Sequence, residues 1–453
     1  MSQSIHQHLI DLSDTNPLLP SNQDYTTPTL PLIPTGPDVV LENPYTEIEI
    51  ISDDIPIAMN NHSVDEGPNS IVCMFVVLFH VTRGHEIIWS LPEELNLDGV
   101  ELKAVPSGMH TVERDFIYFR KAGLFGLSCF AKRAISSQED PDQRGARMMA
   151  LGILCLSPDH LPPHLTFLST TIQNLLDAPN DFSFLIDYYN SFAYNPTTNS
   201  QQTNQHISNL NLSILSSTTG GHDFARFIQI LGPSVFVLWK YLLIQSRVIF
   251  FSKPPIGPCC NWVYFSCLLT QSDYAKINPN PHFYVSVADL DILKEENNFI
   301  ACTTEQILQI KRACYDVFIP LTSSEGEVTG AKINCPGVMI KPILFINNTD
   351  INRYRTLMKR CECRGALLDR EQLNLTCIQY FREINNQLFS HFSDYSQYES
   401  IINPHLLKRA GIDTYGDFTF LRNFCRTYNM KVTLHGESEF SALLCCSPRG
   451  SIV

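Results

Sequence analysis

Two closely spaced carboxylates, Asp289 and Asp291, are candidates in this sequence for general acid–base chemistry. They follow the segment Phe283–Val287, which is predicted to be a strand, and a pair of carboxylates at a strand end can act as an acid and a base. Short acidic side chains also cap helices, because they accept hydrogen bonds from the first backbone N–H groups. Capping of the following helix is the interpretation that the sequence favours.

Two pairs of histidines are candidates for metal binding, because imidazole is a common metal ligand. His80 and His85 flank the end of a predicted strand. His160 and His164 have i, i+4 spacing, but two prolines lie between them, so surface or capping roles are favoured over a metal site. The chain also lacks the phosphate-binding loop, the nucleophile elbow and the zinc-protease motif. We therefore predict no active site for covalent chemistry, no metal and no cofactor.

An aromatic segment, Phe116–Phe119, is a candidate for partner binding. Phe116 and Tyr118 alternate with their neighbours, so one pair of side chains is expected in the core and the other outside it. An outward aromatic pair left uncovered would form a partner surface. Arg114 and Arg120 lie at the two ends of this strand, where solvated arginines are the simplest interpretation.

The acidity of the chain belongs to its first segment. The 453 residues carry 32 basic and 46 acidic side chains, and eleven of the acids but none of the bases precede Arg83. Residues 1–68 also hold nine of the 28 prolines, so an extended, disordered tail is predicted. Without a basic stripe the chain does not fit a nucleic-acid-binding protein. Within the tail, Asp14, Leu18 and Leu19 match a dileucine signal for clathrin adaptors, although an incidental leucine pair is the alternative.

The fifteen cysteines are interpreted as reduced thiols in a cytoplasmic protein. They are odd in number, are scattered singly or as neighbours, and form no C-x-x-C motif. No signal peptide is predicted at the N-terminus, which lacks a basic and then an apolar region. The longest apolar run, Ile71–Phe79, is nine residues, whereas a membrane helix needs about 20. Association with membranes is therefore expected only through partners.

Alternating strands and helices predict an α/β fold in two modules with a helical C-terminal part. The first module, 69–192, is expected to pair its strands early and to append a helix at Pro162–Leu176. A linker rich in Asn, Gln, Thr and Ser is predicted at 193–218. The second module, 219–345, is expected to hold a mostly parallel sheet. Its predicted elements include a long helix from Phe224 that Gly232-Pro233 breaks, a strand at Arg247–Phe251, and a helix from Thr303 to Ala313. Helices are expected in 346–453.

Several stretches together resemble one protein family. They are the segments IIWSLPEELNLDG, SGMHTVERDFIYFRKAGLFGLSCFAKR and RGARMMALGIL in the first module, and in the second Trp239–Cys260 and Val287–Phe318. In this order they resemble the DENN-domain proteins, and most closely the subfamily named LCHN. The resemblance covers roughly residues 70 to 430. It implies a longin-like α/β module, then a central DENN α/β module, then a helical downstream part.

The resemblance also implies a function. Many DENN proteins are guanine-nucleotide exchange factors for Rab GTPases in membrane trafficking, and they bind the nucleotide-free GTPase between the two α/β modules. Such a factor needs no catalytic side chain, which agrees with the missing active site, although a non-catalytic scaffold would agree equally well. Related longin-DENN proteins instead activate GTP hydrolysis through an arginine of the first module. Arg120 or Arg114 is the candidate for that role here. The implied location is cytoplasmic, with recruitment to endosomal or other trafficking membranes.

A groove between the two modules is the expected docking site for a GTPase. The segment Phe116–Lys121, with Phe116, Tyr118 and Arg120, is expected to face it from the first module. Asp289 and Asp291 are expected to face it from the second and to pair with basic residues of the GTPase. The competing interpretation is that these two carboxylates only cap a helix.

Overall fold

The computed structural model describes most of the chain from residue 70 onward. The described residues are 70–136, 145–194, 223–275, 277–324, 326–333, 342–362, 370–397, 401–402, 416–430 and 433–434. All of them belong to one compact unit, Asp65–Val453. The predicted acidic tail and its dileucine motif at Asp14, Leu18 and Leu19 lie outside the described residues, as does nearly all of the predicted linker.

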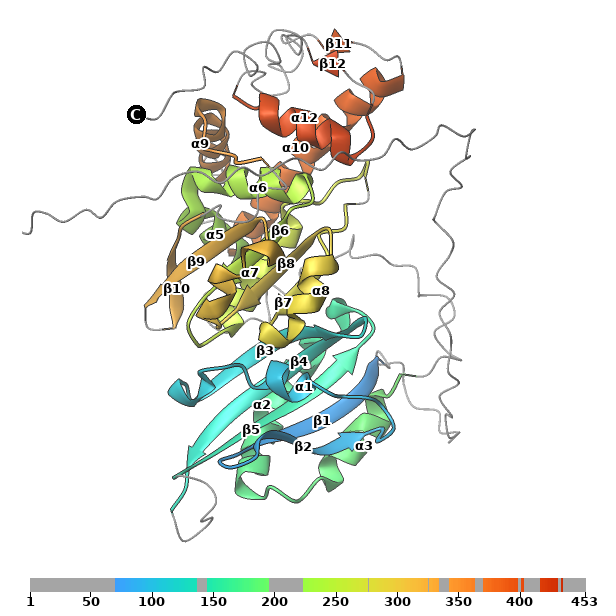
Figure 1. Ribbon diagram of the computed structural model, residues 1–453, viewed down its shortest axis with the longest axis vertical. Coiled ribbons are helices and arrows are strands. Elements are labelled where there is room, and N and C mark those ends of the chain that lie inside the picture. The colour runs from blue at the N-terminus through green and yellow to red at the C-terminus, as the bar shows by residue number, and fades with distance from the viewer. Residues whose placement is uncertain are drawn as a thin grey trace, which may run out of the picture. The chain divides into compact units, whose positions relative to one another are not determined.

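The first module is an antiparallel sheet with helices on it (Figure 1). The tight β3–β4 turn places Ala122 and Gly123 at φ of 48° and 83°, as the Lys-Ala-Gly segment predicts. The strands lie in the order β3-β4-β5-β1-β2. The elements are β1 (Ile71–His80), β2 (Gly84–Leu91), α1 (Val100–Ala104), β3 (Arg114–Lys121), β4 (Leu124–Ala134), β5 (Ala146–Cys155), α2 (Leu165–Asp177) and α3 (Ser183–Phe192).

The second module holds a parallel sheet, β7-β8-β6-β9, with β10 antiparallel at its edge. Gly232 and Pro233 separate its first two helices, as the sequence predicts. The elements are α5 (Phe224–Leu231), α6 (Val235–Leu243), β6 (Arg247–Phe251), α7 (Gly257–Leu268), β7 (Pro281–Tyr284), the 3₁₀ helix η6 (Val287–Asp289), α8 (Leu290–Glu295), β8 (Phe299–Thr303), β9 (Val317–Ser324) and β10 (Glu327–Ala331).

Both faces of this parallel sheet are buried, because successive side chains of a strand point to opposite faces. In β6, Val248 and Phe250 join the large core that contains α7, whereas Ile249 joins a second core beneath α8. β8 and β9 alternate in the same way. The strands therefore read as continuous apolar runs.

Three further helices cover α5 and α6 (Figure 1). They are α9 (Asn348–Glu362), α10 (Arg370–Gln397) and α12 (Phe418–Thr427), and a short parallel pair, β11 (Ile401–Ile402) and β12 (Thr433–Leu434), accompanies them. Buried charges join them to α6: the Lys240 ammonium lies 2.8 Å from Asp350 and 2.6 Å from Asp417, and Arg353 bonds both carboxylates. Two cations thus balance two anions where water is excluded.

The predicted α/β fold class is confirmed, with two local corrections. The segment predicted as a helix from Thr303 to Ala313 instead forms two 3₁₀ helices, η7 (Gln306–Ile310) and η8 (Arg312–Cys314). Thr303 is the last residue of β8 and its hydroxyl accepts a bond from the Glu305 N–H at 3.1 Å, while the Tyr315 hydroxyl donates to the Gln309 carbonyl at 2.5 Å. The strand predicted to end at Val287 ends at Tyr284. Among the described helices, none combines the length and apolar character that a bilayer-spanning segment requires.

Candidate functional site

The two modules share one continuous sheet. β3 of the first module pairs in parallel with β7 of the second, with Phe119 opposite Tyr284. The result is a sheet of ten strands in the order β10-β9-β6-β8-β7-β3-β4-β5-β1-β2. We call the boundary between the two modules the seam. β3 and α1 lie on its first-module side, and α7 lies on its second-module side. Backbone pairing across the seam fixes the first module against the second.

Asp115 of β3 caps a helix of the other module. Its carboxylate accepts hydrogen bonds from the backbone N–H groups of Ile256, at 2.5 Å, and Gly257, at 3.1 and 3.2 Å, where α7 begins. It also accepts one from the N–H of Phe116 at 2.9 Å. Burial raises the pKa of Asp115 to about 7, against the opposing effect of these three N–H donors. A single side chain therefore satisfies the first donors of α7.

Gly257 is the residue that lets this helix approach β3. A Cβ atom at Gly257 would lie 2.5 Å from Asp115 Oδ1 and 2.9 Å from the carbonyl oxygen of Phe116. Both distances are shorter than any real Cβ contact, so a side chain there forces the seam apart. The helix N-terminus and the strand are thus in backbone contact.

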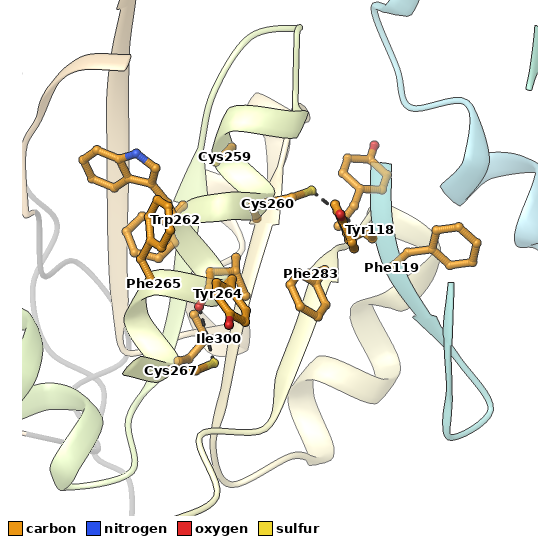
Figure 2. Close-up of a cluster of buried hydrophobic side chains, with 14 of the residues drawn as sticks. Tyr118, Phe119, Cys259, Cys260, Trp262, Tyr264, Phe265, Cys267, Phe283 and Ile300 are labelled. Atoms are coloured by element: carbon orange, nitrogen blue, oxygen red, sulfur yellow. Dashed lines mark hydrogen bonds between the residues drawn. The ribbon is translucent and has the colours of Figure 1, made fainter. Parts of the chain in front are cut away.

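Tyr118 is buried in the seam between α7 and β7 (Figure 2). Its ring lies 5.7 Å from that of Phe283, and its carbonyl accepts a bond from the thiol of Cys260 on α7 at 3.7 Å. Burial raises the pKa of the Tyr118 phenol. Phe116 is half-buried and packs on the same core. Tyr118 is therefore not a partner surface, because the second module already covers it.

The two arginines of β3 are engaged with other elements. Arg120 donates to Asn280 Oδ1 of the second module at 2.6 Å and lies 5.5 Å from the centre of the Phe125 ring. Arg114 donates to the carbonyl and the hydroxyl of Ser169 on α2. Each guanidinium is thus held by contacts within the chain.

Asp289 and Asp291 have different environments. Asp289 is 6 % exposed and belongs to a capping box with Ser286, whose N–H it bonds at 2.9 Å. It also pairs across the seam with Lys103 of α1 at 2.7 Å. The Asp291 side chain is 93 % exposed and pairs with Lys294 at 2.8 Å. Asp289 therefore caps the 3₁₀ helix η6 and ties the modules together, whereas Asp291 faces solvent.

Several exposed apolar side chains belong to elements that border the seam. α1 is joined to η6 by the Lys103–Asp289 pair, and η6 is joined to the start of η7 because the Val287 N–H donates to the Glu305 carboxylate at 2.8 Å. We call the exposed apolar residues of α1, η6, α8 and η7 the rim surface; they are Leu102, Val287, Ile292, Ile307 and Ile310. Exposed apolar side chains on elements linked in this way are candidates for an interaction surface.

Comparison with known proteins identifies the family. The sequence model of the family described as DENN domain-containing protein 11 matches residues 74–329, from β1 to β10. The chain belongs to this DENN-domain family. The relative from Danio rerio is 31 % identical over 392 residues, which cover 82 % of this chain and 77 % of the relative. The relative from Mus musculus is also 31 % identical over 392 residues, covering 82 % and 83 %. Both carry the family's name.

A more distant relative is the late secretory pathway protein avl9 of Schizosaccharomyces pombe. It is 27 % identical over 198 residues, which cover 40 % of this chain and 38 % of the relative. The family match spans both modules, so the resemblance to the DENN family seen in the sequence is confirmed for both of them.

Docking of a GTPase in a groove between the modules stays a prediction. Tyr118, Arg120 and Asp289 do come together at the seam, but they fill it with contacts to the opposite module. The prediction assumed that the modules meet only through their linker, whereas β3 and β7 pair directly. These three side chains are therefore held by contacts within the chain.

Sequence reasoning missed Asp115, Gly257 and Lys103. No local pattern marks Asp115 or Lys103, because their partners lie 141 and 186 positions away. Gly257 did carry a signal, since a glycine followed by proline suits a helix start. Ile307 and Ile310 were missed because nothing in the sequence shows that this side of the helix faces solvent. In a 3₁₀ helix these two side chains lie on one side, three residues apart.

Proposed function

We propose that this chain regulates Rab-type small GTPases as a guanine-nucleotide exchange factor in membrane trafficking. Family membership supports the proposal, and so does the name of the yeast relative, which refers to the late secretory pathway. The observation that carries it is the rim surface, which presents exposed apolar side chains from both modules beside the seam.

Exchange of this kind needs no covalent chemistry and no cofactor. A surface that binds the empty GTPase more tightly than the loaded one weakens nucleotide binding by the same factor, because the two equilibria are linked. Rigid presentation of the surface raises affinity, since less conformational entropy is lost on binding. The seam supplies that rigidity through Asp115, the Lys103–Asp289 pair and the continuous sheet.

Stimulation of GTP hydrolysis is not the activity we propose. An arginine finger must reach the phosphates of the partner's nucleotide. Arg120 is bonded to Asn280 and stacked on Phe125, and Arg114 is bonded to Ser169. Freeing either guanidinium would break contacts that hold the chain together. We therefore assign both arginines to the structure.

We also propose that the protein is cytoplasmic and reaches endosomal or other trafficking membranes through its partners. The GTPase, which is itself anchored to membranes, would supply this recruitment. Clathrin adaptors stay predicted partners on the basis of Asp14, Leu18 and Leu19, which lie outside the described residues.

The test is release of a fluorescent GDP analogue from each member of a Rab panel by the purified full-length chain. We expect acceleration for at least one Rab, and a loss of about tenfold or more in the double variant Ile307→Asp, Ile310→Asp, because charge is placed in an apolar interface. Ile186→Asp is the matched control. It makes the same change at an exposed isoleucine of α3, which packs on β1, three strands away from β3.

Three results would contradict the proposal. If no Rab releases nucleotide faster, exchange activity is absent. If a Rab binds with equal affinity in its GDP, GTP and empty forms, the chain is a scaffold that keeps the fold without the activity. If both aspartate variants lose activity equally, the rim surface is not the site.

A further inference from the structure

Two cysteine thiols face each other between the C-terminal helices. Cys361 lies in the last turn of α9 and Cys377 in the second turn of α10. Their sulfur atoms are 3.8 Å apart, in van der Waals contact, and no other side chain lies between them. Cys377 is buried, whereas Cys361 is half-buried and open to small solutes.

This pair differs from the other cysteines that the structure describes. Of the eleven cysteines in the described residues, ten are buried and Cys361 is not. A comparable pair, Cys260 and Cys302, has its sulfurs 3.6 Å apart, but both thiols are buried in the seam. Burial raises the pKa of Cys155 to about 12, which keeps it protonated and unreactive.

The environment of Cys361 favours its thiolate. Cys377 donates a hydrogen bond to it, which lowers the pKa of Cys361 to about 7 although burial opposes this, while the pKa of Cys377 is raised. At neutral pH more of Cys361 is then ionised than of an ordinary thiol, and the thiolate is the nucleophilic form. Cys361 is thus accessible and nucleophilic, and it has a second thiol in contact.

We propose that Cys361 and Cys377 form a site of oxidation by hydrogen peroxide, whose product is a disulfide between α9 and α10. The Cys361 thiolate attacks one peroxide oxygen, the O–O bond breaks, and hydroxide leaves, which gives a sulfenic acid on Cys361. The Cys377 sulfur then attacks the sulfenic sulfur, an S–S bond forms, and the S–O bond breaks. The proton of Cys377 and the departing hydroxyl leave as water. Two electrons pass from the thiol pair to peroxide, and a dithiol reductant reverses the change.

The disulfide would link α9 to α10 at the C-terminal end of α9, whereas the buried charges lie near its N-terminal end. Near its beginning, α9 is held by Asp350 and Arg353 in the charged cluster with Lys240. α10 is held to α6 by Asn385, which accepts a bond from the indole of Trp239 at 2.7 Å. Cross-linking the two helices at Cys361 therefore closes the chain between them and restricts the unfolded state.

The experiment treats the reduced full-length chain with a small excess of hydrogen peroxide, blocks the remaining thiols, and maps the peptides by mass spectrometry. We expect a peptide that joins Cys361 to Cys377, with the loss of two hydrogens, before any other cysteine reacts. In the variant Cys377→Ser, a sulfenic acid on Cys361 should persist and be trapped by dimedone. The Cys260–Cys302 pair is the internal control, because it has the same spacing without the access.

Thermal unfolding gives an independent measurement. The oxidised wild-type chain should melt several degrees above the reduced chain, and dithiothreitol should abolish the difference. Cys361→Ser should melt at one temperature in both states. The proposal is overturned if the cross-link involves Cys363 instead of Cys377, if Cys361 goes to sulfinic acid while Cys377 stays free, or if Cys260 and Cys302 react first.

Discussion

A single methyl group at Gly257 tests whether contact across the seam holds the two modules together. The substitution Gly257→Ala places a Cβ atom 2.5 Å from Asp115 Oδ1 and 2.9 Å from the Phe116 carbonyl oxygen. The carbonyl belongs to β3 and cannot move alone, so either α7 retreats from the strand or the Asp115 side chain leaves its position. Both adjustments break the bonds that Asp115 accepts from Ile256 and Gly257.

The expected cost follows from those bonds. Leaving a buried N–H group unpaired costs about 1–3 kcal/mol, and the substitution can leave two such groups unpaired at the start of α7. Replacing glycine by alanine in a helix returns up to about 1 kcal/mol, and less in the first turn. We therefore expect Gly257→Ala to lower the free energy of unfolding by about 2–4 kcal/mol.

Urea unfolding followed by tryptophan fluorescence measures this change, since Trp262 lies on α7. The matched control is Gly330→Ala in β10, where a Cβ atom would lie 3.7 Å from the nearest atom, Thr322 Cβ, in ordinary contact. It should unfold within about 1 kcal/mol of the wild type. A Gly257→Ala protein as stable as this control would show that the seam is loose and would refute the reasoning.

Two further predictions concern buried charges. Because burial raises the folded-state pKa of Asp115 to about 7 from 3.8, its contribution to stability is fully present at acid pH and is lost as the pH rises through about 7. Between about pH 5 and about pH 8, the free energy of unfolding of the wild type should therefore fall by about 2–3 kcal/mol relative to that of Asp115→Asn, as measured by urea unfolding. A difference that does not change with pH would contradict the assignment. Lys240→Met should lower stability by about 3–5 kcal/mol, because the buried carboxylates of Asp350 and Asp417 both lose a cation that pairs with them. A thermal melt equal to the wild type would show that the cluster is neutralised in another way.

The strands and most helices were predictable because their patterns are local. Apolar runs gave β1 and β6, the Lys-Ala-Gly turn gave the β3–β4 hairpin, and the Gly232-Pro233 break separated α5 from α6. Segment 303–313 was not predictable in this way. A good capping threonine and a helical spacing favour an α-helix there, but Thr303 is the last residue of β8 and two 3₁₀ helices follow it.

The seam itself could not be predicted from local patterns. Asp115 caps a helix that begins more than a hundred residues later, and no property of its neighbours identifies that partner. The same applies to Lys103, whose partner Asp289 was recognised only as a capping residue. The rim surface was likewise hidden, because exposure of Ile310 depends on which side of a 3₁₀ turn faces the core.

The pairing of β3 with β7 has a consequence for synthesis of the chain on the ribosome. β3 is complete at Lys121, but its partner β7 begins only at Pro281. Throughout that interval the first module presents β3 as an open edge, with unpaired backbone groups that can recruit another strand. The nascent chain is therefore exposed to wrong pairing until most of the second module has emerged, and a chain that stops after the first module keeps that edge permanently. Binding of a chaperone to the β3 edge would protect the protein during this interval.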